Sequence, residues 1–481
     1  MTDFTLPDRA VATSLVTREN VPYWLEREGA AAHLVIGSTD PAVVGGFTGQ
    51  ADGDRFRAAL TPGNAAALRQ ALPWLTPTTF GLSLSAGFGD RLGICTPGHV
   101  AAVNAVGGTI KPVFAQQSIR EMGRTNRTPL MVLDDATWGA FEGGWQGPVG
   151  ADADHLKTLG DIDSCVEAGY VFFTLDPGDH VDPEAESATE AVIRQKAAAL
   201  DWAALDSSLE AFIATYAGHT IELDGEPPVV LDEEAVVRAM AKYGPALVQA
   251  MTMYRHLDGK GIAYEFEMAV DETDYPTKPA EHVVIISELA RLGARPVSFA
   301  PRFVGGFEKG VEYIGDLDAL ARDFQIHAAI ARTLGPYKLS LHSGSDKYST
   351  YPLIAEATQG VVHLKTAGTS WAEALRVIAR HDPALFRDLL RLALDQFEIN
   401  RHSYHLSCDP AKIPANPADD ELDGLVTAID SRQVLHVAYG PALTTLGPRL
   451  FACWSEYRDE LTTIIRDHFV RHLEPFAAWA R

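Results

Sequence analysis

The sequence predicts an α/β fold: a (β/α)8 barrel of the TIM type with an N-terminal appendage and a helical insertion. Apolar, β-rich runs that end in polar residues or glycine occur about eight times between residues 82 and 365. Amphipathic helical patterns separate most of the later runs. This alternation of strands and helices is typical of a parallel sheet that closes into a barrel. An open, doubly wound sheet is the structural alternative.

The expected strands share apolar, β-rich character and a polar or glycine end. In chain order they are Leu82–Gly87, Pro112–Gln117, Val149–His155, Tyr170–Asp176, Ile262–Val270, Pro296–Arg302, Tyr337–His342 and Gly360–Lys365. The helical patterns between and after them include Glu281–Leu292, Leu317–Leu334 and Trp371–Arg380. Two later runs, Tyr404–Asp409 and Val434–Tyr439, are also strand-like, so the sequence leaves the strand count open.

The chain has 481 residues, which leaves room for segments outside the barrel. We expect residues 1–75 to form the appendage, with one short apolar run at His33–Ile36 and several helical stretches. The barrel is expected over residues 76–440, interrupted by the helical insertion at about 183–260. A C-terminal helical segment, residues 441–481, is expected to pack on the outside of the barrel.

Composition narrows the class of protein. The net charge of −24 argues against partners rich in phosphate, so we expect no nucleic acid and no anionic membrane surface. The sequence has no apolar run long enough to span a bilayer and no secretory signal at its start. The scattered cysteines make neither a zinc-ribbon pattern nor a disulfide framework, and they fit the reducing cytoplasm. They are Cys95, Cys165, Cys408 and Cys453.

Three histidines lie at the ends of expected strands. The tetrapeptide His-Leu-Lys-Thr begins at His155 and again at His363, and His342 ends a third strand. In such a barrel the carboxyl ends of the strands meet on one face, so these imidazoles can converge on one divalent cation. Imidazole binds Zn, Co, Ni and Fe well, and three protein ligands with an open position mark a catalytic site. The alternative is that they are buried, hydrogen-bonded histidines.

Acidic and basic residues at the same ends are candidates for chemistry and substrate binding. Glu267 faces into the barrel, where a carboxylate is costly unless it meets a cation, a metal or a shared proton. Asp154 adjoins His155, and strand alternation turns it away from the site unless the strand has curled. The expected substrate contacts are polar or cationic residues near strand ends: Arg302, Arg124, Arg127, Lys365, Ser343 and Lys347.

Several motifs resemble those of the tagaturonate epimerase family. They are Gln116–Ser118, Arg124–Thr128, Ala153–Thr158, Asp176–Val181, Glu267–Thr273, Ala300–Val304, Leu341–Lys347, His363–Thr369 and Arg432–His436. They extend over most of residues 80–440. The resemblance implies a barrel-type isomerase that depends on a divalent metal and interconverts D-tagaturonate and D-fructuronate. Phosphate-loop, dinucleotide, G-x-S-x-G and H-E-x-x-H motifs are absent from the sequence, which disfavours ATP, nicotinamide and serine-hydrolase chemistry.

The implied reaction inverts a carbon that lies β to both the ketone and the carboxylate, so simple enolisation cannot invert it. Retro-aldol cleavage and re-formation of the adjacent bond can. We therefore expect His155, His342 and His363 to bind the metal (Zn, Mn, Co, Ni or Fe) and Asp154 and Glu267 to be the acid–base pair. Arg302 or an arginine of residues 124–127 is expected to hold the carboxylate.

Two other functions stay open from the sequence. A metal-dependent aldolase or ketose isomerase acting on sugar acids would use the same metal and carboxylates. A non-catalytic sugar-acid-binding protein would use the same cations without turnover. In every case the partner is a small sugar acid, and a homo-oligomer is left open.

Overall fold

A closed barrel of eight parallel strands forms the centre of the molecule, in the order β12-β13-β14-β15-β6-β7-β8-β9. The computed structural model describes residues 6–29, 31–404 and 406–480. The barrel strands are β6 (Ser85–Gly87), β7 (Lys111–Ser118), β8 (Gly150–Leu156), β9 (Phe172–Leu175), β12 (Glu265–Ala269), β13 (Ser298–Ala300), β14 (Lys338–Leu341) and β15 (Val362–Lys365). All eight predicted strands are confirmed, and the closed order confirms the barrel over the open sheet.

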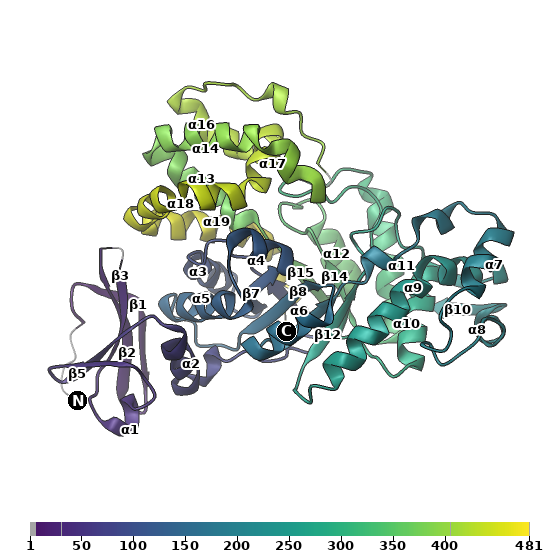
Figure 1. Cartoon of the computed structure of the whole chain (residues 1–481), viewed down its shortest axis with the longest axis horizontal. Coiled ribbons are helices and arrows are strands. Elements are labelled where there is room, and N and C mark those ends of the chain that lie inside the picture. The colour runs from purple at the N-terminus through teal and green to yellow at the C-terminus, as the bar shows by residue number, and fades with distance from the viewer. Residues whose placement is uncertain (1–5, 30, 405, 481) are drawn as a thin grey trace.

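Helices surround the barrel and follow its strands (Figure 1). They are α3 (Thr96–Ala105), α4 (Ile119–Thr125), α5 (Pro129–Glu142), α6 (Leu159–Ala168), α9 (Glu233–Asp258), α10 (Pro279–Arg291), α11 (Leu317–Leu334) and α12 (Tyr351–Thr358). The helix after β15, α13 (Thr369–His381), lies instead with the later helices above the barrel. The three helical patterns identified in the sequence correspond to α10, α11 and α13. Apolar faces at helical spacing bury residues such as Val284 and Phe324. Trp371 of α13 is buried toward the later helices, where it donates to Leu435 O at 2.9 Å.

The N-terminal appendage is mainly a sheet. Five antiparallel strands pair in the order β1-β2-β3-β5-β4. They are β1 (Ala10–Arg18), β2 (Val21–Glu28), β3 (Ala31–Ile36), β4 (Gly49–Asp52) and β5 (Arg55–Ala59), with helices α1 (Pro41–Val44) and α2 (Pro62–Ala71). The run at His33–Ile36 is a strand, and the helical stretches are α1, α2 and a short 3₁₀ turn; the other four strands were not expected. β-Branched and aromatic residues before residue 30 pair as strands, and Arg27 binds Glu142 of α5 at 2.6 Å.

The insertion after β9 contains helices and one hairpin. Its helices are α7 (Glu190–Ala198), α8 (Leu209–Tyr216) and the start of α9, and its hairpin pairs β10 (His219–Leu223) with β11 (Glu226–Leu231). The turn is Asp224-Gly225, with Gly225 at a φ of +77°, which suits a tight hairpin. Short 3₁₀ turns occur at Pro73–Leu75, Gly178–His180, Pro183–Glu186, Arg401–Ser403, Pro410–Lys412 and Asp419–Glu421.

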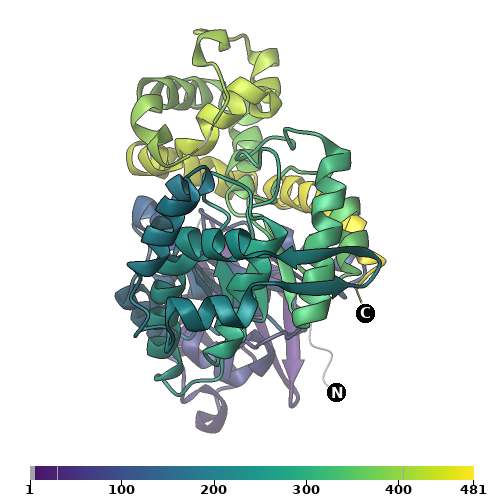
Figure 2. The same cartoon turned by 90° about the vertical axis from the view of Figure 1, so that its right-hand side faces the viewer.

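The chain ends in a second helical layer, seen above the barrel in Figures 1 and 2. It comprises α14 (Pro383–Asp395), α15 (Phe397–Asn400), α16 (Leu422–Thr427), α17 (Ile429–Val437), α18 (Tyr439–Glu456) and α19 (Arg458–Ala477). The strand-like reading of Val434–Tyr439 was wrong, because this run lies in α17 and at the start of α18. Tyr404–Asp409 is irregular where it is described. No helix among the described residues has the length and apolar character needed to cross a membrane.

The last helix packs on the barrel through a glycine. A Cβ added to Gly98 of α3 would lie 2.6 Å from Ile465 Cβ and 2.9 Å from Thr462 O of α19. We therefore expect Gly98→Ala to cost about 1–3 kcal/mol of stability by overpacking, seen as a lower melting temperature. Gly63→Ala in α2 is the matched control, since no atom lies within 4 Å of its added Cβ. A Gly98→Ala melting temperature equal to that of the control would contradict this packing.

Candidate active site

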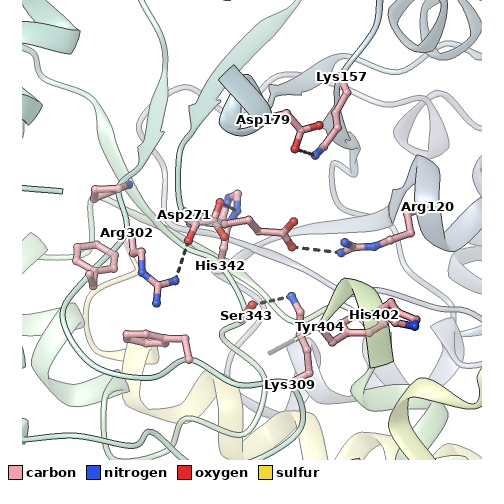
Figure 3. Close-up of a pocket in the computed structure, with 14 residues that line it drawn as sticks. Arg120, Lys157, Asp179, Asp271, Arg302, Lys309, His342, Ser343, His402 and Tyr404 are labelled. Carbon is pink, nitrogen blue, oxygen red and sulfur yellow. Dashed lines mark hydrogen bonds and ion pairs between the residues drawn. The ribbon is translucent and has the colours of Figure 1, made fainter. Parts of the chain in front are cut away.

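A cavity of about 340 Å³ opens at the carboxyl ends of the barrel strands (Figure 3). Its lining is polar and charged, with residues from several loops that follow strands: Arg120, Lys157, Asp179, Asp271, Glu272, Pro301, Arg302, Phe303, Phe307, Lys309, His342, Ser343, His402 and Tyr404. A smaller inner cavity reaches Asp154, His155 and Lys365 inside the barrel. The site therefore lies where a barrel of this kind positions reactive groups.

Two of the three predicted histidines meet at the floor of the cavity. The ring centroids of His155 and His342 are 4.9 Å apart. One nitrogen of each, together with a carboxylate oxygen of Asp271, forms a group whose atoms all lie within 4.8 Å of one another. His155 also belongs to an overlapping group with Asp176 and Glu272. Imidazole and carboxylate are ligands that suit a divalent transition metal.

A carboxylate orients each of these imidazoles from behind. Glu267 Oε1 lies 2.6 Å from His342 Nε2, and Asp176 Oδ2 lies 3.1 Å from His155 Nδ1. If the nitrogens facing these carboxylates carry the hydrogen, the other nitrogen of each ring, His342 Nδ1 and His155 Nε2, keeps a lone pair that can bind a metal. A carboxylate behind a ligating histidine is the usual arrangement in metal sites, because it fixes the tautomer and the orientation of the ring.

The contact between His342 and Asp271 is close: burial lowers the pKa of His342, but Asp271 outweighs it and raises that pKa. His342 Nδ1 and Asp271 Oδ1 are 2.8 Å apart, yet neither buried atom makes a hydrogen bond of normal geometry within the described part of the chain. Buried polar atoms without a hydrogen-bond partner are rare in folded proteins and require an explanation. A metal ion held jointly with His155 would supply it.

The backbone of β8 brings Asp154 and His155 to the same site. His155 has a φ of +51°, in the left-handed region that non-glycine residues seldom adopt. The pairing of β8 with β9 shifts register between Ala153 and Leu156. Strand alternation is broken there, so both side chains line the inner cavity. Such a conformation costs about 1–3 kcal/mol and is typical of functional sites.

His363 lies deeper in the barrel than the other two histidines. It pairs with Ser340, two residues before His342, and its Nδ1 lies 2.8 Å from the Ser85 hydroxyl. It belongs to none of the possible metal-binding groups among the described residues. Burial holds its pKa well below the ordinary value. The structure therefore does not bring His363 together with His155 and His342, because its strand register places it one layer lower.

Lys365 is the central cation of the barrel interior. Its ammonium lies 2.9 Å from Asp152, 2.8 Å from Asp154 and 3.0 Å from Glu267, and it donates to Thr174 at 2.5 Å. Burial disfavours the charged ammonium, but the carboxylates outweigh this and raise its pKa well above the usual value. These contacts use all its hydrogens, so Lys365 holds carboxylates in place of the expected substrate contact.

The pKa values of the carboxylates around Lys365 shift in opposite directions. Burial raises the pKa of Asp152 to about 7 in spite of the neighbouring ammonium. Burial also favours neutral Glu267, but Lys365 and His342 hold its pKa well below the ordinary value. Glu267 additionally accepts a short hydrogen bond from Ser298. With both oxygens engaged, it is fixed as a support for His342 and is poorly placed to exchange protons with a substrate.

The remaining predicted contacts divide into cavity and framework residues. Arg302 and Ser343 line the outer cavity. Arg124 donates to the Tyr404 hydroxyl at 3.2 Å, and neither cavity includes it. Arg127 binds Asp90 O and Asp135. Lys347 is buried and donates to main-chain carbonyls. Neither cavity is lined by any of these three residues.

Several cavity residues had no clear signal in the sequence. Lys309, Tyr404 and His402 come from irregular segments without a recognisable motif. Asp271 was visible as part of an acidic run after a strand, but solvated loop acids have the same pattern. Arg120 pairs with Glu272 at 3.2 Å, and its guanidinium lies 5.0 Å from the Tyr404 ring centre.

Comparisons with known proteins identify the family of the chain. A family model described as tagaturonate epimerase matches residues 13–476. The chain is 41% identical over 422 residues to the tagaturonate/fructuronate epimerase of Thermotoga maritima, covering 85% of this chain and 84% of the relative. It is similar to the fructuronate-tagaturonate epimerase structure from Cohnella laeviribosi, both native and with one glycerol bound. Each comparison gives a TM-score of 0.91 and 33% identity over 97% of this chain and 96% of the other.

The charge balance around Lys365 gives a stability test. Lys365→Met leaves buried carboxylates without their cation, so we expect a loss of about 3–5 kcal/mol, read from the urea unfolding midpoint. Lys157→Met is the control, because the Lys157 side chain is 41% exposed and its 2.7 Å pair with Asp179 is a surface pair. That variant should lose no more than about 1 kcal/mol. Equal losses in the two variants would refute a structural role for Lys365.

Proposed function

The chain belongs to the tagaturonate epimerase family, and from that premise we propose that it interconverts D-tagaturonate and D-fructuronate by breaking and re-forming one carbon–carbon bond. It is an isomerase, so the alternative of a non-catalytic sugar-acid-binding protein loses its support. One observation carries the mechanistic part of the proposal. His155, His342 and Asp271 converge at the cavity floor, and a carboxylate backs each imidazole.

The substrate dictates the type of reaction. The carbon that inverts lies two bonds from the ketone carbon and two from the carboxylate carbon, so neither group makes its C–H acidic. A base instead removes the proton of its hydroxyl, and the oxygen forms a carbonyl as the bond to the carbon next to the ketone breaks. The electron pair of that bond passes into an enediolate. The aldehyde then turns its opposite face toward the enediolate, and the carbon–carbon bond re-forms. The alkoxide formed in this step takes up a proton.

The proposed metal ligands are His155, His342 and Asp271, with Asp271 in place of the predicted His363. Glu267 and Asp176 orient the two imidazoles from behind, at 2.6 and 3.1 Å. A divalent metal held there would act as a Lewis acid on the ketone and stabilise the negative charge of the enediolate. Two neutral imidazoles and a carboxylate leave coordination positions for a ketone and its neighbouring hydroxyl.

Proton transfer at the two faces of the aldehyde needs two groups. We propose Asp154 for the inner face, as the sequence analysis predicts, because it lines the inner cavity and lies 3.8 Å from His155. Burial favours neutral Asp154, but Lys365 and His155 hold its pKa below the ordinary value, so its carboxylate is in the ionised form that a base requires. Glu272 lines the outer cavity and takes the second position in place of Glu267.

Arg302 and Ser343 are proposed as substrate contacts on the outer wall. Arg302 Nη1 lies 3.4 Å from Asp271 O, so its guanidinium also supports the loop that carries a proposed metal ligand. Ser343, with a φ of +48°, directly follows His342. Its strained backbone turns the chain sharply at the cavity edge.

The reaction itself can be followed by NMR. Incubation of the purified protein with D-tagaturonate should yield D-fructuronate, and a chelator should stop the conversion. In D₂O the retro-aldol route predicts no deuterium at the inverted carbon, because its C–H bond never breaks. Deuterium uptake there would rule out this route, while aldehyde and ketone fragments accumulating as final products would favour an aldolase.

Metal retention separates the two ligand sets. We expect His155→Ala, His342→Ala and Asp271→Ala each to lose most of the bound metal, because each removes a proposed ligand. His363→Ala should retain it, because that ring bonds Ser85 one layer below. Elemental analysis after dialysis measures the metal content, and melting temperatures check that each variant is folded. A folded His363→Ala protein without metal would restore the assignment to three histidines.

A further inference from the structure

Lys309 stands at the junction of the two cavities. It lies in the loop after β13, between Gly305 and Gly315, and it lines both the outer and the inner cavity. We propose that Lys309 binds the carboxylate of the sugar acid and so sets the preference for acids over neutral ketoses. This inference rests on the proposed function and adds a specificity residue to it.

Among the described residues Lys309 forms no close ion pair, although its charge helps, with that of His155, to lower the pKa of Glu272. Its ammonium donates to the Ser343 hydroxyl at 2.6 Å, and no carboxylate of residues 6–29, 31–404 or 406–480 lies within 4.0 Å (Figure 3). The neighbouring cations are paired, since Arg120 binds Glu272 at 3.2 Å and Lys157 binds Asp179 at 2.7 Å. In a chain with a net charge of −24, an ammonium without a close ion pair at a cavity junction is suited to an anionic ligand.

The backbone that carries Lys309 is clamped on both sides. Lys347 Nζ donates to Glu308 O at 2.7 Å and to Val311 O at 2.5 Å. Arg432 Nε donates to Gly310 O at 2.6 Å. Buried cations thus bind the main-chain carbonyls around Lys309, which makes its position rigid. Rigid support of this kind reduces the entropy lost when a side chain binds a ligand.

The clamp is itself braced by a buried polar cluster. The Arg432 guanidinium lies 3.1 Å from both carboxylate oxygens of Asp346 and 3.0 Å from Glu373. Asp346, His468 and His472 have the spacing of a metal site. However, Arg432 already neutralises Asp346, and His472 accepts a hydrogen bond from the Asp346 backbone N–H at 3.0 Å. The cluster therefore supports the clamp and offers no second metal site.

Lys309 suits the carboxylate better than Arg302 does. Arg302 also lacks an ion pair among the residues that the structure describes, but it lines only the outer cavity and already donates to Asp271 O at 3.4 Å. Lys309 borders both cavities beside Ser343, the residue after His342. This assigns to Lys309 the role that the sequence analysis predicts for Arg302.

The position of the carboxylate also matters for the inversion. When the carbon–carbon bond breaks, the carboxylate stays with the aldehyde half. An ammonium that holds the carboxylate retains this half in the cavity. Rotation about the bond between the aldehyde carbon and its remaining carbon neighbour can then present the opposite carbonyl face while the charged end stays fixed. Lys309 would therefore serve both selection of the acid and retention of the fragment.

The test compares two inhibitors that differ only in the carboxylate, D-galactonate and galactitol. In Lys309→Met we expect the inhibition constant of galactonate and the KM of tagaturonate to rise about 10- to 100-fold, as for loss of a charge-assisted bond. Galactitol inhibition should change by less than about 3-fold. Lys412→Met, an exposed lysine outside both cavities, is the control and should match the wild type. Release of free aldehyde should also increase in Lys309→Met.

The outcomes separate this inference from the proposed function. A wild-type protein that fails to convert tagaturonate overturns the proposed function. A wild type that converts tagaturonate but binds galactonate and galactitol equally overturns the role of Lys309. An unchanged ratio of the galactitol to the galactonate inhibition constant in Lys309→Met does the same. The role is also overturned if this ratio is lost in Arg302→Met and kept in Lys309→Met. Melting temperatures and Lys309→Arg, which keeps the charge and should keep most of the ratio, exclude misfolding as the cause.

Discussion

A single buried ammonium allows the barrel interior to be acidic. Lys365 binds carboxylates from β8 and β12 at 2.8–3.0 Å, where an unpaired carboxylate would be strongly unfavourable. Because Glu267 is held there, it can orient His342, and His342 in turn faces Asp271. The proposed cation site at the mouth therefore depends on a charge balance one layer below it. The same balance keeps Asp154 ionised beside the inner cavity.

The C-terminal helices complete the site. They supply Tyr404 through the segment after α15, and Arg432 of α17 clamps the loop that carries Lys309. In the proposed complex, barrel strands and their loops position the reactive end of the substrate, while the helical layer positions its charged end. This division gives the second layer of helices a role at the proposed site.

The barrel was predictable because its strands are short apolar runs that end in polar residues. Strand ends also located His155, His342 and Asp154 correctly near one another. The two copies of His-Leu-Lys-Thr show the limit of this reasoning. His155 adopts a left-handed backbone at the end of β8, whereas His363 stays in the ladder of β15, bonded to Ser85. The two identical tetrapeptides place their histidines at different depths in the barrel, because neighbouring strands set the register and the local backbone geometry.

Loop residues were harder to predict for a related reason. Lys347 follows a strand and looked like a ligand contact, but the fold turns it inward to hold the carbonyls of the loop that carries Lys309. Lys309 has no motif, and its importance comes from long-range contacts that no local pattern encodes. The antiparallel N-terminal sheet was missed because its strands are only partly buried and their alternation is irregular, as in β1.

The central claim is that His155, His342 and Asp271 bind one divalent metal ion, oriented by Glu267 and Asp176. A crystal structure of the cobalt-loaded protein, with anomalous scattering measured at the cobalt edge, tests it most directly. We predict a single strong peak within coordinating distance of these three side chains and none beside His363. A peak that includes His363 and excludes Asp271, or a peak at Asp346, His468 and His472 alone, would contradict the account.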